Sequence, residues 1–306
     1  MNRPPRIKSR DLHGIVLLDK PSGLSSNQAL QAVRKLLRAA KGGHTGALDP
    51  LATGLLPLCF GEATKLAGSL LGARKAYLAQ CRLGVTTDTA DSEGEVVRRR
   101  PLPALDDAVI EGALARLRGR ILQVPPMYSA LKRDGRPLYA LARQGIEVER
   151  EARTIEIRRL ELVAIRESAI DLVCECAKGT YIRVLGEDIA RALGTVGHLT
   201  RLHRAWVEPF RDLPMCSLET ALEGAGQGHN LLPADAPLQG LARASLTAEQ
   251  LAAVRHGQAV QAEAHPRPPQ GRRVRIYAPD GLFVGLAEAR PDGWLQPRRL
   301  IHASAM

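Results

Sequence analysis

The chain contains 306 residues, 45% of them hydrophobic and 25% charged, which is typical of a globular protein with enough core for one large and one small domain. Its 43 lysines and arginines outnumber its 32 acidic residues, giving a formal net charge of +11. This excess favours a polyanionic partner such as nucleic acid, although a solvated basic surface also produces it. Aromatic residues make up only 3% of the chain, which excludes a broad aromatic platform for stacking single-stranded bases.

Cysteine usage and hydropathy indicate a reducing, cytoplasmic setting. The chain has five cysteines, an odd number, and none forms a C-x-x-C pair. Cys174 and Cys176 fall on one face of an alternating strand and lack the two further ligands that a structural zinc site needs. The longest apolar run near the N-terminus, Ile15 to Leu18, is too short for a signal peptide or a membrane span. We therefore expect a cytoplasmic protein without a metal ion.

The first 120 residues predict strands and helices in alternation. Ser25 and Gln28 have the spacing of a capping box, which marks a helix start, and Tyr77, Ala79 and Cys81 alternate with polar residues as a half-buried strand does. The predicted elements are a mobile basic tail at 1–10, a strand at 14–19, a helix from 25 that ends at 42–43, a strand at 75–84, a solvated acidic turn at 86–94 and an amphipathic helix at 106–117.

The remaining residues predict more strand than helix. The expected elements are a mixed basic insertion at 123–152, strands at 153–165 and 169–176, a helix at 184–193, a linker at 218–242, and short strands around a helix at 247–256. This pattern predicts an α+β protein in which residues 1–240 form a domain on a mixed or antiparallel sheet. Residues 243–306 are expected to form a small β-rich domain.

One carboxylate occupies an unusual loop. Asp49 is the only acid between Lys20 and Phe60, with glycines at positions 43, 46 and 54 and Pro50 directly after it. Glycine permits positive φ and close backbone approach, and proline restricts the residue before it. Asp-Pro is also an ordinary helix start, with Asp as the N-cap, so on local sequence both readings stand.

Long motifs in a fixed order resolve this choice. The chain resembles the bacterial tRNA pseudouridine-55 synthases, the TruB family, over about residues 11–240, and more weakly in its C-terminal part. The motifs that carry the resemblance are LDKPSGLSS (18–26), GHTGALDPLATG (43–54), GEATK (61–65), RLG (82–84) with TDT (87–89), PMYSALK (126–132), KGTYIR (178–183) and LLPAD (231–235).

The resemblance implies an isomerase that converts the T-loop uridine of tRNA, at position 55, to pseudouridine without a cofactor. It implies an active-site cleft across the centre of the sheet and a C-terminal PUA domain. It assigns Asp49 as the catalytic nucleophile, and Arg183 is expected to keep this buried carboxylate ionised through a forked contact. Tyr77 matches the family's active-site tyrosine, which stacks on the base and takes part in proton transfer.

Four further residues are expected to bind the substrate. Tyr181 and Leu202 match family positions that contact the target base, and His44 matches a residue that stacks in the RNA where the base has left. Lys20 is expected to support the Asp49 loop or a phosphate. On local sequence alone His44 is equally well a structural histidine, and Leu202 a core residue.

The expected partner is the T-arm of tRNA, with the target uridine flipped out of its stack and the insertion at 123–152 contacting the backbone. We expect a monomer that needs no protein partner and no membrane. Two alternatives remain open. One is a factor that folds tRNA, alone or as a second role, and the other is the catalytic subunit of a guide-RNA ribonucleoprotein, which a pulldown of partners would reveal.

Overall fold

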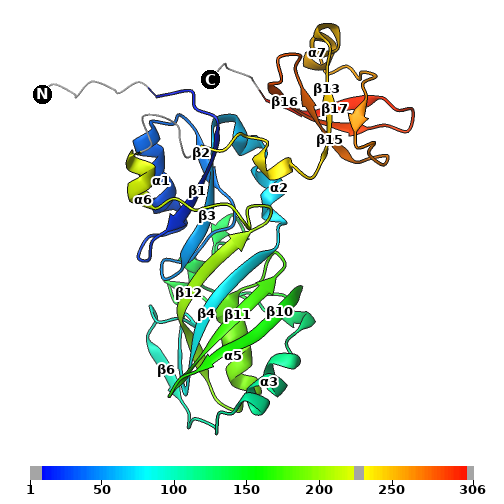
Figure 1. Cartoon of the computed structure of the whole chain (residues 1–306). Helices are drawn as coiled ribbons and strands as arrows, with labels where there is room; N and C mark the ends of the chain where they lie inside the picture. Colours follow the sequence, from blue (N-terminus) through cyan, green and yellow to red (C-terminus); the bar gives the residue numbers. More distant parts are fainter. Residues whose placement is uncertain (1–8, 224–230, 302–306) are drawn as a thin grey trace, which may run out of the picture.

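The computed structural model describes residues 9–223 and 231–301, and these form an α+β protein with two main sheets (Figure 1). The larger sheet has eight strands in the order β1-β3-β12-β4-β11-β10-β7, with β2 paired to β3. Its strands are β1 (Gly14–Lys20), β2 (Gly42–His44), β3 (Thr53–Phe60), β4 (Lys75–Leu83), β7 (Gly119–Gln123), β10 (Arg153–Ile165), β11 (Ala169–Cys176) and β12 (Gly197–Val207).

The sheet narrows where its two halves meet. Strands β3 and β12 are parallel and share only two register pairs, His203 with Thr53 and Arg204 with Gly54. On the other side of β12, the antiparallel partner β4 sets Tyr77 opposite Arg204. All other neighbouring pairs of this sheet are antiparallel. The loop between β2 and β3, which carries Asp49, therefore leaves the sheet at this short parallel junction.

Helices cover one face of the sheet. The main core lies between the strands and α1 (Ser26–Leu37), α3 (Asp107–Ala115) and α5 (Ile182–Ala192). Helix α1 begins at the predicted capping box, but it ends at Leu37, where Arg38 adopts the left-handed conformation. The prediction of an end at 42–43 is wrong because Gly42 and Gly43 pair with β3 instead.

On the opposite face, the half of the sheet formed by β1 and β3 packs against a second cluster that includes Leu70 of α2 and Phe210. The short elements that follow β3 are the 3-10 helix η1 (Gly61–Lys65) and α2 (Ala67–Leu71).

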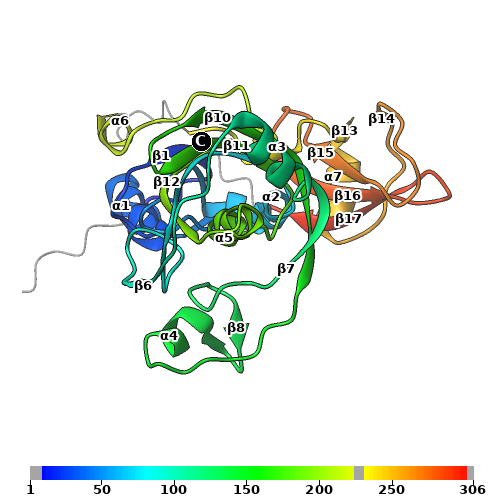
Figure 2. The ribbon, with the colours of Figure 1, turned by 90° about the horizontal axis from the view of Figure 1, so that it is seen from below.

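Two small hairpins extend from the main sheet. Strands β5 (Val85–Thr87) and β6 (Val96–Arg99) form one hairpin, and β8 (Lys132–Arg133) pairs with β9 (Arg136–Pro137) ahead of α4 (Leu138–Ala142). Figure 2 shows β8 and α4 set apart from the main sheet, on the side where α5 lies. This insertion thus stands over the helical face.

The segment predicted as a linker is largely folded in its described part. It contains α6 (Leu218–Glu223) and the 3-10 helix η3 (Ala236–Leu238), and Leu232 bridges to Ile15 of β1 through two backbone hydrogen bonds of 2.8 and 2.9 Å. Residues 1–8 of the predicted basic tail lie outside the described part of the chain. At the end of this tail, the Arg10 amide donates a hydrogen bond to the Arg38 carbonyl at 2.8 Å.

The C-terminal part of the chain forms its own five-stranded sheet in the order β14-β13-β15-β16-β17. Its elements are β13 (Ala242–Ser245), α7 (Ala248–Arg255), β14 (Ala264–His265), β15 (Arg273–Tyr277), β16 (Phe283–Ala289) and β17 (Leu295–Leu300). A separate apolar cluster forms the core of this module. A small group of buried leucines, Leu66, Leu238 and Leu286, joins the module to the main domain. The result is a small β-rich module beside the large sheet (Figure 1).

Candidate active site

Asp49 lies in a turn rather than at a helix start. Its backbone carbonyl accepts a 3.0 Å hydrogen bond from Ala52, and the chain continues directly into β3. Gly46 and Gly54 have φ of +70° and +95°, as the glycine spacing predicts, whereas Gly43 is part of β2. The Asp49 side chain is 40% exposed. The loop therefore presents a single carboxylate to solvent at the junction of the two half-sheets.

Arg183 holds this carboxylate with a fork. Its Nε donates to Asp49 Oδ2 at 2.8 Å and its Nη2 to Oδ1 at 3.2 Å. Arg183 comes from the first turn of α5 and is only 4% exposed, and its remaining donors bind the carbonyls of Thr89 at 2.8 Å and Tyr128 at 2.7 Å. A guanidinium that is itself fixed by two carbonyls and donates twice to one carboxylate holds that carboxylate in a defined orientation.

A second carboxylate belongs to the same site. Asp91 is 3% exposed, and its Oδ2 lies 3.7 Å from Arg183 Nε, while Thr89 donates to its Oδ1 at 2.6 Å. Burial, reinforced by Asp91 and Asp49, raises the pKa of the nearby Glu93. The predicted turn at 86–94 is present, with Asp88 and Glu93 exposed, but the prediction that it is solvated fails at Asp91. The turn is folded against the arginine, a long-range contact that turn composition does not reveal.

Lys20 lies under the loop. Its side chain is fully buried, and its Nζ donates to the carbonyls of Pro21 (2.8 Å), Leu24 (2.6 Å) and Pro50 (3.3 Å). Burial lowers the pKa of Lys20 to about 8, against the opposing pull of Glu93 and Asp49. These contacts favour support of the Asp49 loop over contact with a phosphate.

Tyr77 and Leu202 come from the strands beside the loop. Both are 7% exposed, and Leu202 opposes Ala79 in the β12–β4 register. Burial raises the pKa of the Tyr77 phenol to about 12, against the opposing charge of Arg204. Among the described residues Tyr77 shares no hydrogen bond with Asp49, and the two come from different elements, β4 and the loop between β2 and β3.

His44 and Tyr181 flank the site from β2 and from the N-cap of α5. Burial, reinforced by Arg204, lowers the pKa of His44, so its imidazole is neutral at physiological pH. The His44 Nδ1 atom is buried and has no hydrogen-bond partner in the described part of the chain. The Tyr181 backbone is held by Gln123, whose side chain bonds both its amide (2.8 Å) and its carbonyl (3.1 Å).

Two buried cations near Tyr77 have no counterpart among the predicted site residues. Lys75 is 8% exposed and donates to the Ala73 carbonyl at 2.7 Å, and Arg204 is 1% exposed. Burial lowers the pKa of Lys75 to about 8, and the positive charge of Arg204 adds to this effect. Their sequence signal is weak, because each is one basic residue on an alternating strand.

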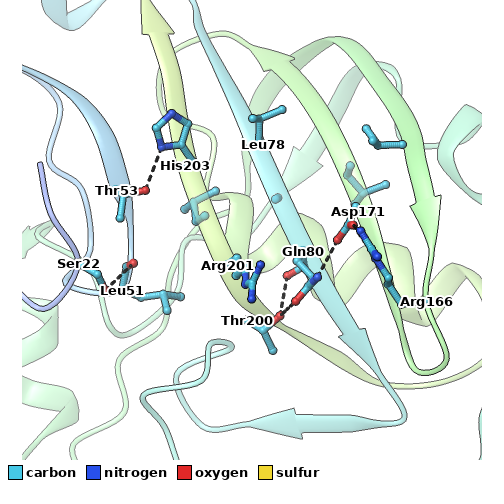
Figure 3. Close-up of a pocket in the computed structure, with 14 residues that line it drawn as sticks. Ser22, Leu51, Thr53, Leu78, Gln80, Arg166, Asp171, Thr200, Arg201 and His203 are labelled. Carbon is cyan, nitrogen blue, oxygen red and sulfur yellow. Dashed lines mark hydrogen bonds and ion pairs between the residues drawn. The ribbon is translucent and has the colours of Figure 1, made fainter. Parts of the chain in front are cut away.

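The back of the loop borders a pocket of about 710 Å³ (Figure 3). The pocket lies on the face of the sheet to which Leu78, Gln80 and His203 point, and His203 Nδ1 lies 2.9 Å from Thr53 Oγ1. Leu51 and Thr53 of the Asp49 loop line one side, and Leu202 also contributes. Leu202 thus belongs to both the main core and the wall of this pocket.

The arginines of the insertion are mostly solvent-facing. Arg133, Arg136 and Arg143 are exposed, whereas Arg150 is partly buried with an ion pair to Glu147 at 3.3 Å. Within residues 9–223 and 231–301, no group of three or more His, Cys, Asp or Glu side chains is arranged to hold a metal ion. None of the helices in this part is long and apolar enough to span a bilayer.

Two family models match the chain. Residues 34–182 match the TruB family pseudouridylate synthase N-terminal domain, and residues 227–301 match the pseudouridine synthase II TruB C-terminal domain. A curated relative from Xanthomonas campestris, named tRNA pseudouridine synthase B, is 52% identical over 97% of each chain. One of the same name from Stutzerimonas stutzeri is 49% identical over 96% of this chain and 97% of its own.

Solved structures share the fold. The chain aligns with a Cbf5-Nop10-Gar1 complex at a TM-score of 0.68 and 26% identity, covering 90% of this chain and 78% of the other. It also aligns with an H/ACA RNP bound to a substrate RNA containing 2′-deoxyuridine, at a TM-score of 0.70 and 23% identity, covering 94% and 85%. The latter likeness supports the fold alone.

Proposed function

The chain belongs to the TruB family of pseudouridylate synthases, and we propose that it isomerises the uridine at position 55 in the T-loop of tRNA. As a pseudouridine synthase it catalyses an isomerisation. The tRNA substrate is supported by relatives about 50% identical over nearly the whole chain, which are named tRNA pseudouridine synthase B. The structural neighbours from the Cbf5-Nop10-Gar1 complex and the H/ACA RNP share only 26% and 23% identity with this chain. We therefore favour direct action on tRNA by a cytoplasmic monomer without an obligate protein partner.

The observation that carries this proposal is the Asp49–Arg183 fork. Isomerisation breaks the bond from ribose C1′ to N1 of uracil, turns the base and forms a bond from C1′ to C5. The C5 proton is lost to a base and N1 gains one, so no redox partner is consumed. In this scheme Asp49 is the nucleophile, because its carboxylate is partly exposed and accepts two hydrogen bonds from the buried guanidinium of Arg183.

Other residues act around this pair. A flipped uridine stacks on Tyr77, whose phenol takes part in proton transfer. Tyr181 and Leu202 contact the base. His44 fills the gap that the flipped base leaves in the RNA. Lys20 supports the loop through the Pro50 carbonyl.

Binding is assigned to surfaces away from the chemistry. Flipping a base costs a few kcal/mol, which contacts to the RNA backbone offset. The insertion at 123–152 carries exposed arginines on the side where α5 lies (Figure 2), and we assign it to the T-arm backbone. We assign the module at 243–306 to further RNA contacts as a PUA-like domain, and residues 1–240 to catalysis.

The proposal is tested by mapping pseudouridine at nucleotide resolution in an unmodified tRNA transcript incubated with the purified protein. We expect modification at position 55 alone, and its loss in a transcript that carries cytidine there. Modification at another position would refute the assigned target. Binding without modification of any transcript would instead indicate an RNA-folding role.

A further inference from the structure

Arg204 is a charged residue placed where charge is costly. It lies on β12 with 1% of its surface exposed, and in the described residues it forms no ion pair with a carboxylate. Removing a guanidinium from water without a counter-ion costs several kcal/mol, so a neutral residue would be favoured if packing were its only role. The role of this guanidinium is therefore indicated by the groups to which its N–H groups donate.

The guanidinium binds both ends of the loop that carries Asp49. Arg204 Nε donates to the Leu55 carbonyl at 2.7 Å, and Nη2 donates to the Gly46 carbonyl at 2.9 Å. Residues 46 and 55 bracket Asp49 in sequence, and one planar group thus closes the loop at its base. Carbonyl acceptors also partly compensate the buried charge.

Both glycines of the loop lie close to Arg204, but only at Gly54 does its backbone leave no room for a side chain. A β-carbon on Gly54, at φ +95°, would lie 2.3 Å from the Arg204 carbonyl oxygen and 2.8 Å from its amide nitrogen. A β-carbon on Gly46, at φ +70°, would lie 3.3 Å from Lys75 Cε and 3.5 Å from Arg204 Nη1. The backbone of Arg204 therefore excludes a side chain at residue 54, whereas at residue 46 the positive φ is what favours glycine.

Arg204 also ties the loop to the strand of the predicted active-site tyrosine. In the sheet register its Cα is paired with Gly54 of β3 on one side and with Tyr77 of β4 on the other. In the part of the chain that the structure describes, no hydrogen bond joins the side chains of Asp49 and Tyr77. Arg204 nevertheless pairs with the backbone on both sides, at Gly54 beside the loop and at Tyr77 itself.

We propose that Arg204 is a positioning residue that fixes the Asp49 loop against the β4 strand carrying Tyr77. The proposal rests on the function proposed above, because it matters only if Asp49 and Tyr77 act on one substrate. Arg183 holds the carboxylate itself, and Arg204 holds the backbone from which that carboxylate projects. The two arginines thus act on different parts of the same loop.

The test compares Arg204→Met and Arg204→Lys with wild type and with a matched control, Arg118→Met. Arg118 also binds a backbone carbonyl, that of Leu160 of β10, at 2.9 and 2.6 Å, and it pairs with Glu111 of α3, away from the Asp49 loop. Each protein is first checked for folding by circular dichroism. The measurements are then the single-turnover rate at saturating protein, the dissociation constant for tRNA, and amide hydrogen exchange.

We expect Arg204→Met to lower the single-turnover rate by about 10²-fold, the effect of a misplacement of about 1 Å, while the dissociation constant changes less than about threefold. Exchange should rise at Thr45 and Ala52, whose amides bond Pro57 and Asp49. Arg204→Lys keeps the charge and one donor, so it should fall between wild type and methionine. Arg118→Met should keep the wild-type rate and loop protection.

A folded Arg204→Met protein with the wild-type rate and unchanged loop exchange would overturn the proposal. If Arg204→Met does not fold, Arg204→Lys decides: a wild-type rate with wild-type loop exchange refutes the positioning role. Failure of the proposed function is distinguishable, since wild type itself would then form no pseudouridine. The exchange measurement reports the state of the loop even in that case.

Discussion

Replacing Arg183 by lysine keeps the positive charge but removes the planar, forked donor that contacts Asp49. Arg183 makes four hydrogen bonds, two to Asp49 and one each to the carbonyls of Thr89 and Tyr128. A lysine ammonium donates from a single nitrogen and cannot span these acceptors. One unmade hydrogen bond involving a charged group costs about 1.5–3 kcal/mol, and lysine leaves at least one acceptor unpaired, so we expect the free energy of unfolding to fall by at least that amount. Displacement of Asp49 by about 1 Å should lower the rate by about 10²-fold.

The assay follows directly from the chemistry. Bond formation at C5 expels its hydrogen, so tRNA carrying tritium at C5 of uridine releases label as the reaction proceeds. Arg191→Lys is the matched control, because Arg191 lies on the same helix in a surface pair with Asp188 and is 74% exposed. We expect the control to match wild type in rate. A single-turnover rate for Arg183→Lys within about threefold of wild type would mean that the fork does not position the nucleophile.

Three further outcomes follow from the site. Tyr77→Phe should retain tRNA affinity while slowing the saturated rate by about 10²- to 10⁴-fold, and normal turnover would exclude proton transfer by this phenol. Replacing Arg136 and Arg143 by alanine should flatten the slope of log affinity against log salt by about one to two units with little change in the saturated rate, and an unaltered slope would remove these residues from the RNA interface. Burial lowers the pKa of Lys75 from 10.5 to about 8, so between these values the unfolded state binds more protons and stability contributed by this group rises with pH. Urea unfolding should therefore show wild type gaining on Lys75→Met between about pH 8 and pH 10, and a constant difference between them would contradict the assigned burial cost.

Local sequence predicted the elements whose residues face one core. Strand β11 at Ala169–Cys176 alternates buried and partly exposed residues along its whole length, and its predicted bounds match the structure. Helix α5 was predicted from residue 184 and begins at Ile182. Strands β3 and β12 were not predicted. In β3, Leu55, Leu56, Leu58, Cys59 and Phe60 are all buried, because both faces of this strand are covered, so no alternation marks it.

The candidate site was predicted through the family motifs rather than from patterning. Asp49 and Arg183 lie 134 residues apart, and nothing local to either residue predicts the contact. For Asp91 the sequence predicts only a place in a solvated turn, and the fold shows its burial against Arg183. Arg204 was not identified, since a buried arginine that binds backbone carbonyls leaves no complementary residue in the sequence.

The central claim is that Asp49 is the nucleophile of a uridine isomerase, and Asp49→Asn tests it most directly. Asparagine keeps the size and most of the loop contacts but cannot act as a carboxylate nucleophile. We predict that the purified variant is folded, binds tRNA with nearly wild-type affinity and forms no measurable pseudouridine in a single-turnover assay at saturating protein. Turnover within about tenfold of wild type would contradict the account.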